Sequence, residues 1–173
     1  MIGRPGPDEA VSYYFKYIDR IQTEDVVGKL ESQLDESLNL YRGVSEEKSL
    51  ERYAADKWSA RQVLNHVNDC ERLFVFRAMW FARGFDSELP SFDEKVASAG
   101  VPSDDVPWAA HVEEFRGARL GTVAFFRNLP PEAWMRTGTA SGYLFSVRAL
   151  AYIAAGHLAH HTAILRERYN LAS

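Results

Sequence analysis

The chain has 173 residues, which fits one domain that can bury about two-thirds of the surface its unfolded form exposes. A formal net charge of −4 leaves no basic surplus to neutralise phosphates, so a general nucleic-acid binder is not expected. The single cysteine, Cys70, cannot form an internal disulfide, which favours a reducing, cytoplasmic compartment. No apolar run reaches the about 18 residues of a membrane-spanning helix, and no contact with a membrane is expected.

The first elements are a lead-in and a helix. Residues 1–20 are expected to form a lead-in that packs on the domain, with an aromatic stretch that is irregular or briefly helical. Residues 21–173 are expected to form the domain itself. Its first helix starts near Thr23 as N-cap, continues with apolar residues three and four apart, and ends at Gly43. A polar connector covers residues 45–57.

The second and third helices have clear boundaries. Ser59 and Gln62 form a capping box, and the apolar pattern that follows runs to Gly84. Residues 85–104 form a long loop, a length typical of a lid or wall of a site. The third helix starts at residues 105–107 and ends before Pro130.

The last part of the chain is expected to hold a second loop, over residues 132–145, and a fourth helix. That helix starts at Ser146 as N-cap and runs to about Tyr169. No alternating strand pattern is visible. Four helices of about 20 residues predict an all-α protein, a four-helix bundle with long connecting loops.

Three of the five histidines lie within residues 156–161 of the fourth helix. His157 and His161 are four residues apart, so they share one face, and that face is the apolar stripe. Buried imidazoles are costly unless their nitrogens are satisfied, and a cation satisfies them. His66, beside the core stripe of the second helix, is the third candidate ligand, since three imidazoles plus solvent form a typical open metal site. His160 is an alternative to His161.

The simplest alternative is that these histidines are ordinary hydrogen-bonded core or surface residues. His111, on the third helix, is interpreted in this way. Cys70 lies one turn after His66 and is either a further ligand or, as we favour, a small apolar filler.

Charged residues near the second-helix histidine have two interpretations each. Arg77 points toward the core and needs an anion. It pairs with a carboxylate, as we favour, or holds an anionic ligand; the candidate carboxylates are Glu113, Glu114 and Asp69. Asp69 and Glu71 either orient a histidine or form bridges at the surface. Arg148 lies in the first turn of the fourth helix, where the dipole disfavours a cation, so a specific partner is expected.

Several segments together carry a resemblance to a known family. They are residues 52–59 (Arg-Tyr-Ala-Ala-Asp-Lys-Trp-Ser), 63–66 (Val-Leu-Asn-His), 81–84 (Phe-Ala-Arg-Gly), 140–142 (Ala-Ser-Gly), 146–157 (Ser-Val-Arg-Ala-Leu-Ala-Tyr-Ile-Ala-Ala-Gly-His) and 160–161 (His-His). In these segments the chain resembles the DinB-like (DinB/YfiT-type) superfamily of metal-dependent enzymes, from about Tyr14 to Tyr169. The resemblance implies a bundle whose metal is held by His66, His157 and His161. Relatives commonly carry Gly-His-Glu-x-His-His, and Leu158 stands here in place of that glutamate, so any role of the glutamate is lost or moved.

The resemblance also implies a cofactor and a chemistry. The metal is expected to be divalent, nickel or zinc first and manganese or iron second, and relatives are often homodimers. Relatives include thiol-dependent S-transferases. We therefore expect a transferase in which the metal activates a low-molecular-weight thiol against a small-molecule substrate, with Arg77 or Arg148 holding the anionic part of that thiol. The alternatives are a metal-dependent hydrolase that uses metal-bound hydroxide and a non-catalytic metal-binding stress-response protein.

Overall fold

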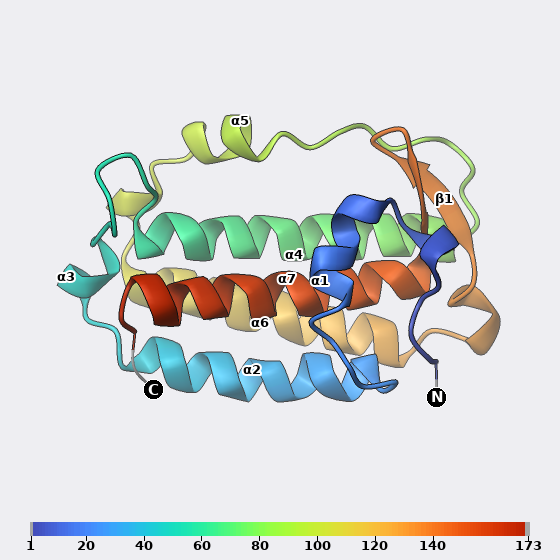
Figure 1. Cartoon of the computed structure of the whole chain (residues 1–173), viewed down its shortest axis with the longest axis horizontal. Coiled ribbons are helices and arrows are strands. Elements are labelled where there is room, and N and C mark those ends of the chain that lie inside the picture. Colours follow the sequence, from blue (N-terminus) through green and yellow to red (C-terminus); the bar gives the residue numbers. More distant parts are fainter. Residues whose placement is uncertain (1, 172–173) are drawn as a thin grey trace.

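Four long helices form the body of the protein. The computed structural model describes residues 2–171, and its long helices are α2 (Val26–Arg42), α4 (Ala60–Ala82), α6 (Trp108–Arg127) and α7 (Val147–Arg168). They lie side by side (Figure 1), with contacts between α2 and α6, α6 and α4, α4 and α7, and α7 and α2. The predicted four-helix bundle is therefore confirmed. In the described chain, no helix has the length and apolar character needed to cross a membrane.

The helix starts show how local chemistry sets these boundaries. The hydroxyl of Ser59 accepts from the backbone N–H of Gln62, whose side chain accepts from the Ser59 N–H, as predicted. Ser146 caps α7, also as predicted. The prediction for α2 was wrong by two residues. Asp25 is the N-cap and accepts from Gly28, while the hydroxyl of Thr23 accepts from the N–H of Asp25 and so belongs to the turn before the helix.

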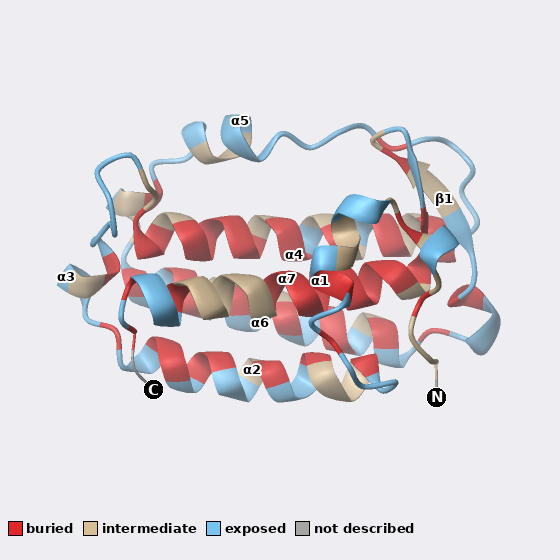
Figure 2. Ribbon diagram, in the orientation of Figure 1, coloured by how far each residue is buried: buried red, intermediate tan, exposed pale blue. Residues whose placement is uncertain are grey.

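Helix α7 is the centre of the core. Nearly every residue in its first three turns is buried (Figure 2), because the helix contacts α1, α2 and α4 at once. Tyr152 is fully buried and donates its hydroxyl to the Thr23 carbonyl. The homodimer stays a prediction.

A β-hairpin replaces the loop expected over residues 132–145. Strand β1 (Thr137–Ala140) pairs antiparallel with β2 (Tyr143–Ser146), and a bridge joins Leu89 to Ala140. The turn residues Ser141 and Gly142 have φ of 56° and 78°, as a two-residue type I′ turn requires. The expectation of no strands was wrong because each strand has four residues, too few to show an alternating pattern.

Both connectors contain short helices. The polar connector holds α3 (Glu46–Ser49), and the loop after α4 holds α5 (Glu94–Ala99) and a 3-10 turn, Ser103–Asp105. Figure 1 shows this second connector running along the length of α4. Its residues Phe92 and Glu94 line a cavity together with residues of α4.

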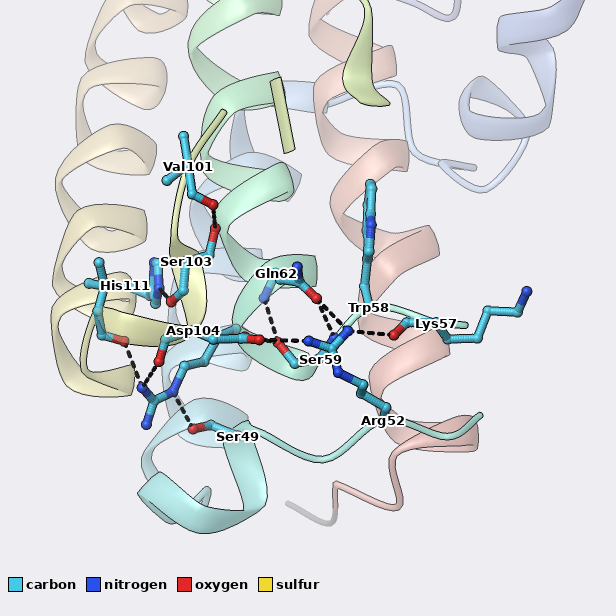
Figure 3. A network of polar contacts seen from close by, with 12 residues as sticks. Ser49, Arg52, Lys57, Trp58, Ser59, Gln62, Val101, Ser103, Asp104 and His111 are labelled. Atoms are coloured by element: carbon cyan, nitrogen blue, oxygen red, sulfur yellow. Dashed lines mark hydrogen bonds and ion pairs between the residues drawn. The ribbon is translucent and has the colours of Figure 1, made fainter. Parts of the chain in front are cut away.

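A polar network fixes the end of that connector to the start of α4 (Figure 3). Asp104 accepts from the Ser59 hydroxyl and, at 2.6 Å, from Arg52. Arg61 donates to the carbonyl oxygen of Asp104 at 2.7 Å. These bonds hold the backbone next to Trp58, whose ring packs against that of His66.

The lead-in crosses α7 at a glycine. It consists of two 3-10 turns (Pro7–Glu9, Ser12–Tyr14) and α1 (Phe15–Ile18). A Cβ atom at Gly156 would lie 2.1 Å from the carbonyl oxygen of Tyr17, so only glycine permits this close approach. The lead-in thus forms short helical turns, and α1 contacts α7.

Candidate metal centre

Three histidines meet between α4 and α7. His66 comes from α4, and His157 and His161 come from successive turns of α7. One ring nitrogen of each lies within 4.8 Å of the others, and the Nε2 atoms of His66 and His157 are 3.1 Å apart. His66 and His157 are about 95% buried, while His161 is partly exposed. The structure therefore brings together the three residues named from the sequence, which we call the histidine triad.

Burial keeps the triad uncharged. It is the main reason why the pKa of each imidazole is lowered; His161 and His66 lower the pKa of His157 further, and His66 lowers that of His161 further. The pKa of His161 falls to about 3. Neutral imidazole is the form that binds a metal ion, so the triad offers its lone pairs at neutral pH.

The triad fits a divalent metal. Two nitrogens bound to one tetrahedral zinc lie roughly 3.3 Å apart, given Zn–N bonds of about 2.0 Å. The His66–His157 separation of 3.1 Å is close to that value. In addition, Nδ1 of His161 is buried without a hydrogen-bond partner, so this ring is not explained by protein contacts alone. A set of three imidazoles suits zinc or nickel.

Aromatic rings enclose the triad. The centroid of Trp58 lies 5.1 Å from that of His66, and those of Tyr17 and Phe74 lie 5.2 Å and 5.5 Å from that of His157. Such walls limit water and strengthen electrostatic interactions at the site.

Two cavities lie next to the triad. One, of about 230 Å³, is bordered by His161 and Trp58. The other, which we call the Arg77 cavity, has a volume of about 70 Å³ and is lined by His157, Cys70, Arg77 and residues of the lead-in, the hairpin and α5. A small molecule thus has room on either side of the ligands.

The structure also shows where the other residues discussed in the sequence analysis lie. His160 lies beside Tyr17, with ring centroids 5.5 Å apart, and is outside the triad. The Sγ of Cys70 lies 3.7 Å from His66, and burial raises the pKa of the thiol, so it stays protonated. Leu158 is buried in an apolar cluster. His111 is a buried packing residue whose Nε2 contacts the Ser103 carbonyl oxygen.

The predicted carboxylate partners of Arg77 are not its partners. Glu114 pairs with Arg72, Glu113 pairs with Arg116, and Asp69 accepts from Asn65. That interpretation was therefore wrong.

Arg148 has a structural partner. It pairs with Glu9 and donates to the Ile2 carbonyl oxygen at 2.9 Å, which fixes the lead-in to α7. The Arg77 cavity does not include it among its lining residues. A contact between Arg148 and a cofactor stays a prediction.

A buried polar network was missed by sequence reasoning. Arg119 on α6 donates to Glu71 on α4 at 2.9 Å and to Gln33 on α2 at 3.2 Å. Gln33 donates in turn to the Ala155 carbonyl on α7 at 2.8 Å, two residues before His157. Glu71 therefore orients the helices rather than a histidine. In the sequence, the only signal for this network is the presence of charged residues on α4 and α6.

Comparison with known proteins places the chain in a family. Its structure is similar to that of YfiT from Bacillus subtilis, with a TM-score of 0.71 and 18% sequence identity, covering 99% of this chain and 97% of YfiT. The crystal structure of a DinB-like protein from Bacillus subtilis is also similar, with a TM-score of 0.61, 19% identity, and 85% and 90% of the two chains covered. No curated protein sequence matches the chain. The family model of the DinB superfamily matches residues 29–165, a range that includes all three histidines, and the chain therefore belongs to the DinB superfamily.

Proposed function

We propose that the protein is a metal-dependent enzyme for small molecules, and specifically a thiol-dependent S-transferase. The observation that carries the proposal is the triad itself: three neutral imidazoles that converge beside a cavity. His66, His157 and His161 are the proposed ligands of one divalent ion, nickel or zinc first. Bound there, such an ion lowers the pKa of a thiol in its open position and keeps it as the thiolate.

The protein's own residues fit thiol chemistry better than water chemistry. A thiol would release its proton to solvent on binding to the metal, so no general base would have to be positioned beside the ligands. The described residues bring no carboxylate into the ligand cluster, and Leu158 stands where relatives commonly carry a glutamate. The rings of Trp58, Tyr17 and Phe74 keep bulk water from the reacting thiolate.

Elemental analysis of the purified protein tests the metal. We expect about one equivalent in the parent and its loss in His66→Ala and His161→Ala. His160→Ala is the matched control, because this ring adjoins the triad without belonging to it, and it should keep the metal. The absence of bound metal after incubation with nickel, zinc and manganese salts would overturn the proposal.

A thiol panel tests the reaction. The metal-loaded protein is incubated with low-molecular-weight thiols such as cysteine and glutathione, together with chlorodinitrobenzene or an epoxide as electrophile. Metal-dependent conjugation that is lost in His161→Ala supports a transferase. Conjugation no faster than with the metal-free protein rejects it.

A hydrolase is the second candidate, because a carboxylate does lie at the rim of the cavity. Glu94 on α5 lines it beside His157, and its charge partly offsets the burial that lowers the pKa of His66. The similar protein YfiT is described as a probable metal-dependent hydrolase. Ester or amide turnover without added thiol, reduced in Glu94→Gln, would favour this function over the transferase.

A further inference from the structure

Arg77 is a buried cation without a carboxylate partner. Its side chain is 2% exposed, and no ion pair to it is found within residues 2–171. Its Nη2 donates to the Pro90 carbonyl oxygen at 3.2 Å and to the Ser141 hydroxyl at 2.9 Å. Both acceptors are neutral. A guanidinium buried with neutral partners alone is expensive, so a buried anion is the group that this position lacks.

The Arg77 side chain, with its unpartnered Nε, borders the cavity. Nε of Arg77 is buried with no hydrogen-bond partner, and the side chain lines the same cavity as His157. By contrast, the other fully buried arginine, Arg119, has a carboxylate at 2.9 Å. Both arginines are buried and both have an Nε without a partner, but only Arg77, which lines the cavity, has no carboxylate within residues 2–171.

The hairpin turn contacts this guanidinium through Ser141. Ser141 holds a positive φ of 56°, a conformation that non-glycine residues seldom adopt, and its hydroxyl accepts from Arg77. Its N–H donates to the Leu89 carbonyl oxygen at 3.0 Å, which ties the turn to the connector after α4. The chain therefore fixes the orientation of Arg77 from a second element and leaves Nε without a partner.

We propose that the Arg77 end of this cavity binds the carboxylate of the small molecule that reaches the histidine triad. The proposal rests on the proposed function and specifies the substrate class, a thiol or thiol acceptor with a carboxylate tail. The cavity, of about 70 Å³, is also lined by Tyr13 and Phe92, whose rings are exposed to solvent. Arg77 follows His66 by eleven residues, about 16 Å along the helix, and its side chain leans back toward the triad. The molecule is thus elongated, with its two ends apart.

The protein's own carboxylate at this cavity is that of Glu94. It is exposed and lines the cavity without an ion pair to Arg77. As a second carboxylate at the rim, it competes with a bound carboxylate for the guanidinium. Removing its charge in Glu94→Gln should therefore tighten carboxylate binding.

The test uses the cobalt-loaded protein and thiols of graded length. Mercaptoacetate, mercaptopropionate, mercaptohexanoate and mercaptooctanoate are compared with the mercapto alcohols of equal length, and the thiolate-to-cobalt absorption band reports binding. Since a hydrogen bond to a charged group contributes about 1.5–3 kcal/mol, the best acid should bind at least roughly tenfold more tightly than its alcohol. The preference should be greatest for the longer acids. Acids and alcohols of equal affinity at every length would overturn the proposal.

Variants locate the effect at Arg77. Arg77→Gln should abolish the preference for acids over alcohols, and Arg77→Lys, which keeps the charge without the planar fork, should restore part of it. Thermal melting shows whether each variant is folded. An undiminished preference in folded Arg77→Gln would also overturn the proposal.

A metal-free measurement separates this site from the proposed function. Hexanoate, which has no thiol, is titrated while the Nε–H signal of Arg77 is followed by NMR. A shift of that signal, absent with hexanol, supports the carboxylate site even where no thiol binds cobalt, and then only the transferase reaction is rejected. Thiol binding to cobalt without any response of Arg77 to hexanoate or to the acid series rejects the carboxylate site alone.

Discussion

Replacement of Arg119 by methionine should destabilise the bundle strongly, because it leaves Glu71 as an uncompensated buried charge. The two side chains are 0% and 3% exposed, and their nitrogen and oxygen lie 2.9 Å apart. Gln33 also loses the donor to its amide oxygen. The same substitution at Arg127 is the matched control, since that arginine, also on α6, pairs with Glu31 on α2 at 2.7 Å, with side chains 51% and 58% exposed.

The magnitude follows from burial. Breaking a buried pair by removing one partner costs about 3–5 kcal/mol, a large share of the roughly 5–15 kcal/mol that a domain of this kind has. For a chain of this length that loss lowers Tm by about 6–20 °C. The exposed Arg127 pair contributes at most about 1 kcal/mol.

Urea unfolding of a double-mutant cycle measures the effect. Arg119→Met and Glu71→Leu should each lower the free energy of unfolding, and the double variant should be more stable than either single one, because both charges leave together. Two additive losses, or an Arg119→Met loss no greater than that of Arg127→Met, would refute the reasoning.

Three further outcomes are expected. Gly156→Ala should cost about 1–3 kcal/mol in urea unfolding, because its Cβ would meet the Tyr17 carbonyl oxygen. The metal-free protein should lose stability as the pH falls from about 6.5, the pKa of an unfolded histidine, towards the folded pKa of His161 near 3. The unfolded chain binds more protons across that window, so the slope is at most about 1.4 kcal/mol per pH unit for each such histidine. Ser59→Ala should cost about 1 kcal/mol or more in thermal melts, since the hydroxyl both caps α4 and donates to Asp104.

Each of these has its own control. Gly117→Ala lies mid-helix on α6 with open space around its Cβ, and it should stabilise by up to about 1 kcal/mol where Gly156→Ala destabilises. Equal effects at the two glycines would contradict the crowding at Tyr17. Urea midpoints that do not change between pH 7 and pH 5 would contradict buried neutral histidines, and Ser32→Ala, an exposed serine within α2, provides the baseline for Ser59→Ala.

Local signals allowed much of the fold to be predicted. Ser59 with Gln62 and Ser146 gave correct helix starts, because a cap needs only residues within one turn. The spacing of His157 and His161 placed them on one face of a core helix for the same reason. His66 could be added because it borders an apolar stripe, and the structure does bring it to the other two. That they bind an ion stays a prediction.

Features that depend on tertiary contacts could not be predicted. The Arg119 network joins four helices, and its partners depend on how each helix is rotated about its axis. Likewise, Arg77 shares its face with Cys70 in the sequence pattern, but the pattern does not show that the nearby carboxylates are paired elsewhere. The type I′ turn at Ser141 uses a residue that seldom adopts positive φ, so sequence preference gave no signal for it.

The crossing of the lead-in over α7 also affects the order in which the chain folds during synthesis. Glu9 and Arg148 are 139 positions apart in sequence, yet their contact holds the lead-in in place, and Tyr17 meets Gly156 over a similar separation. Contacts of such long sequence separation form late, since a long loop must close before they contribute. On the ribosome, the lead-in is synthesised well before α7 and has nothing to dock on until that helix emerges. The aromatic wall of the histidine triad is therefore completed only when nearly the whole bundle has been synthesised.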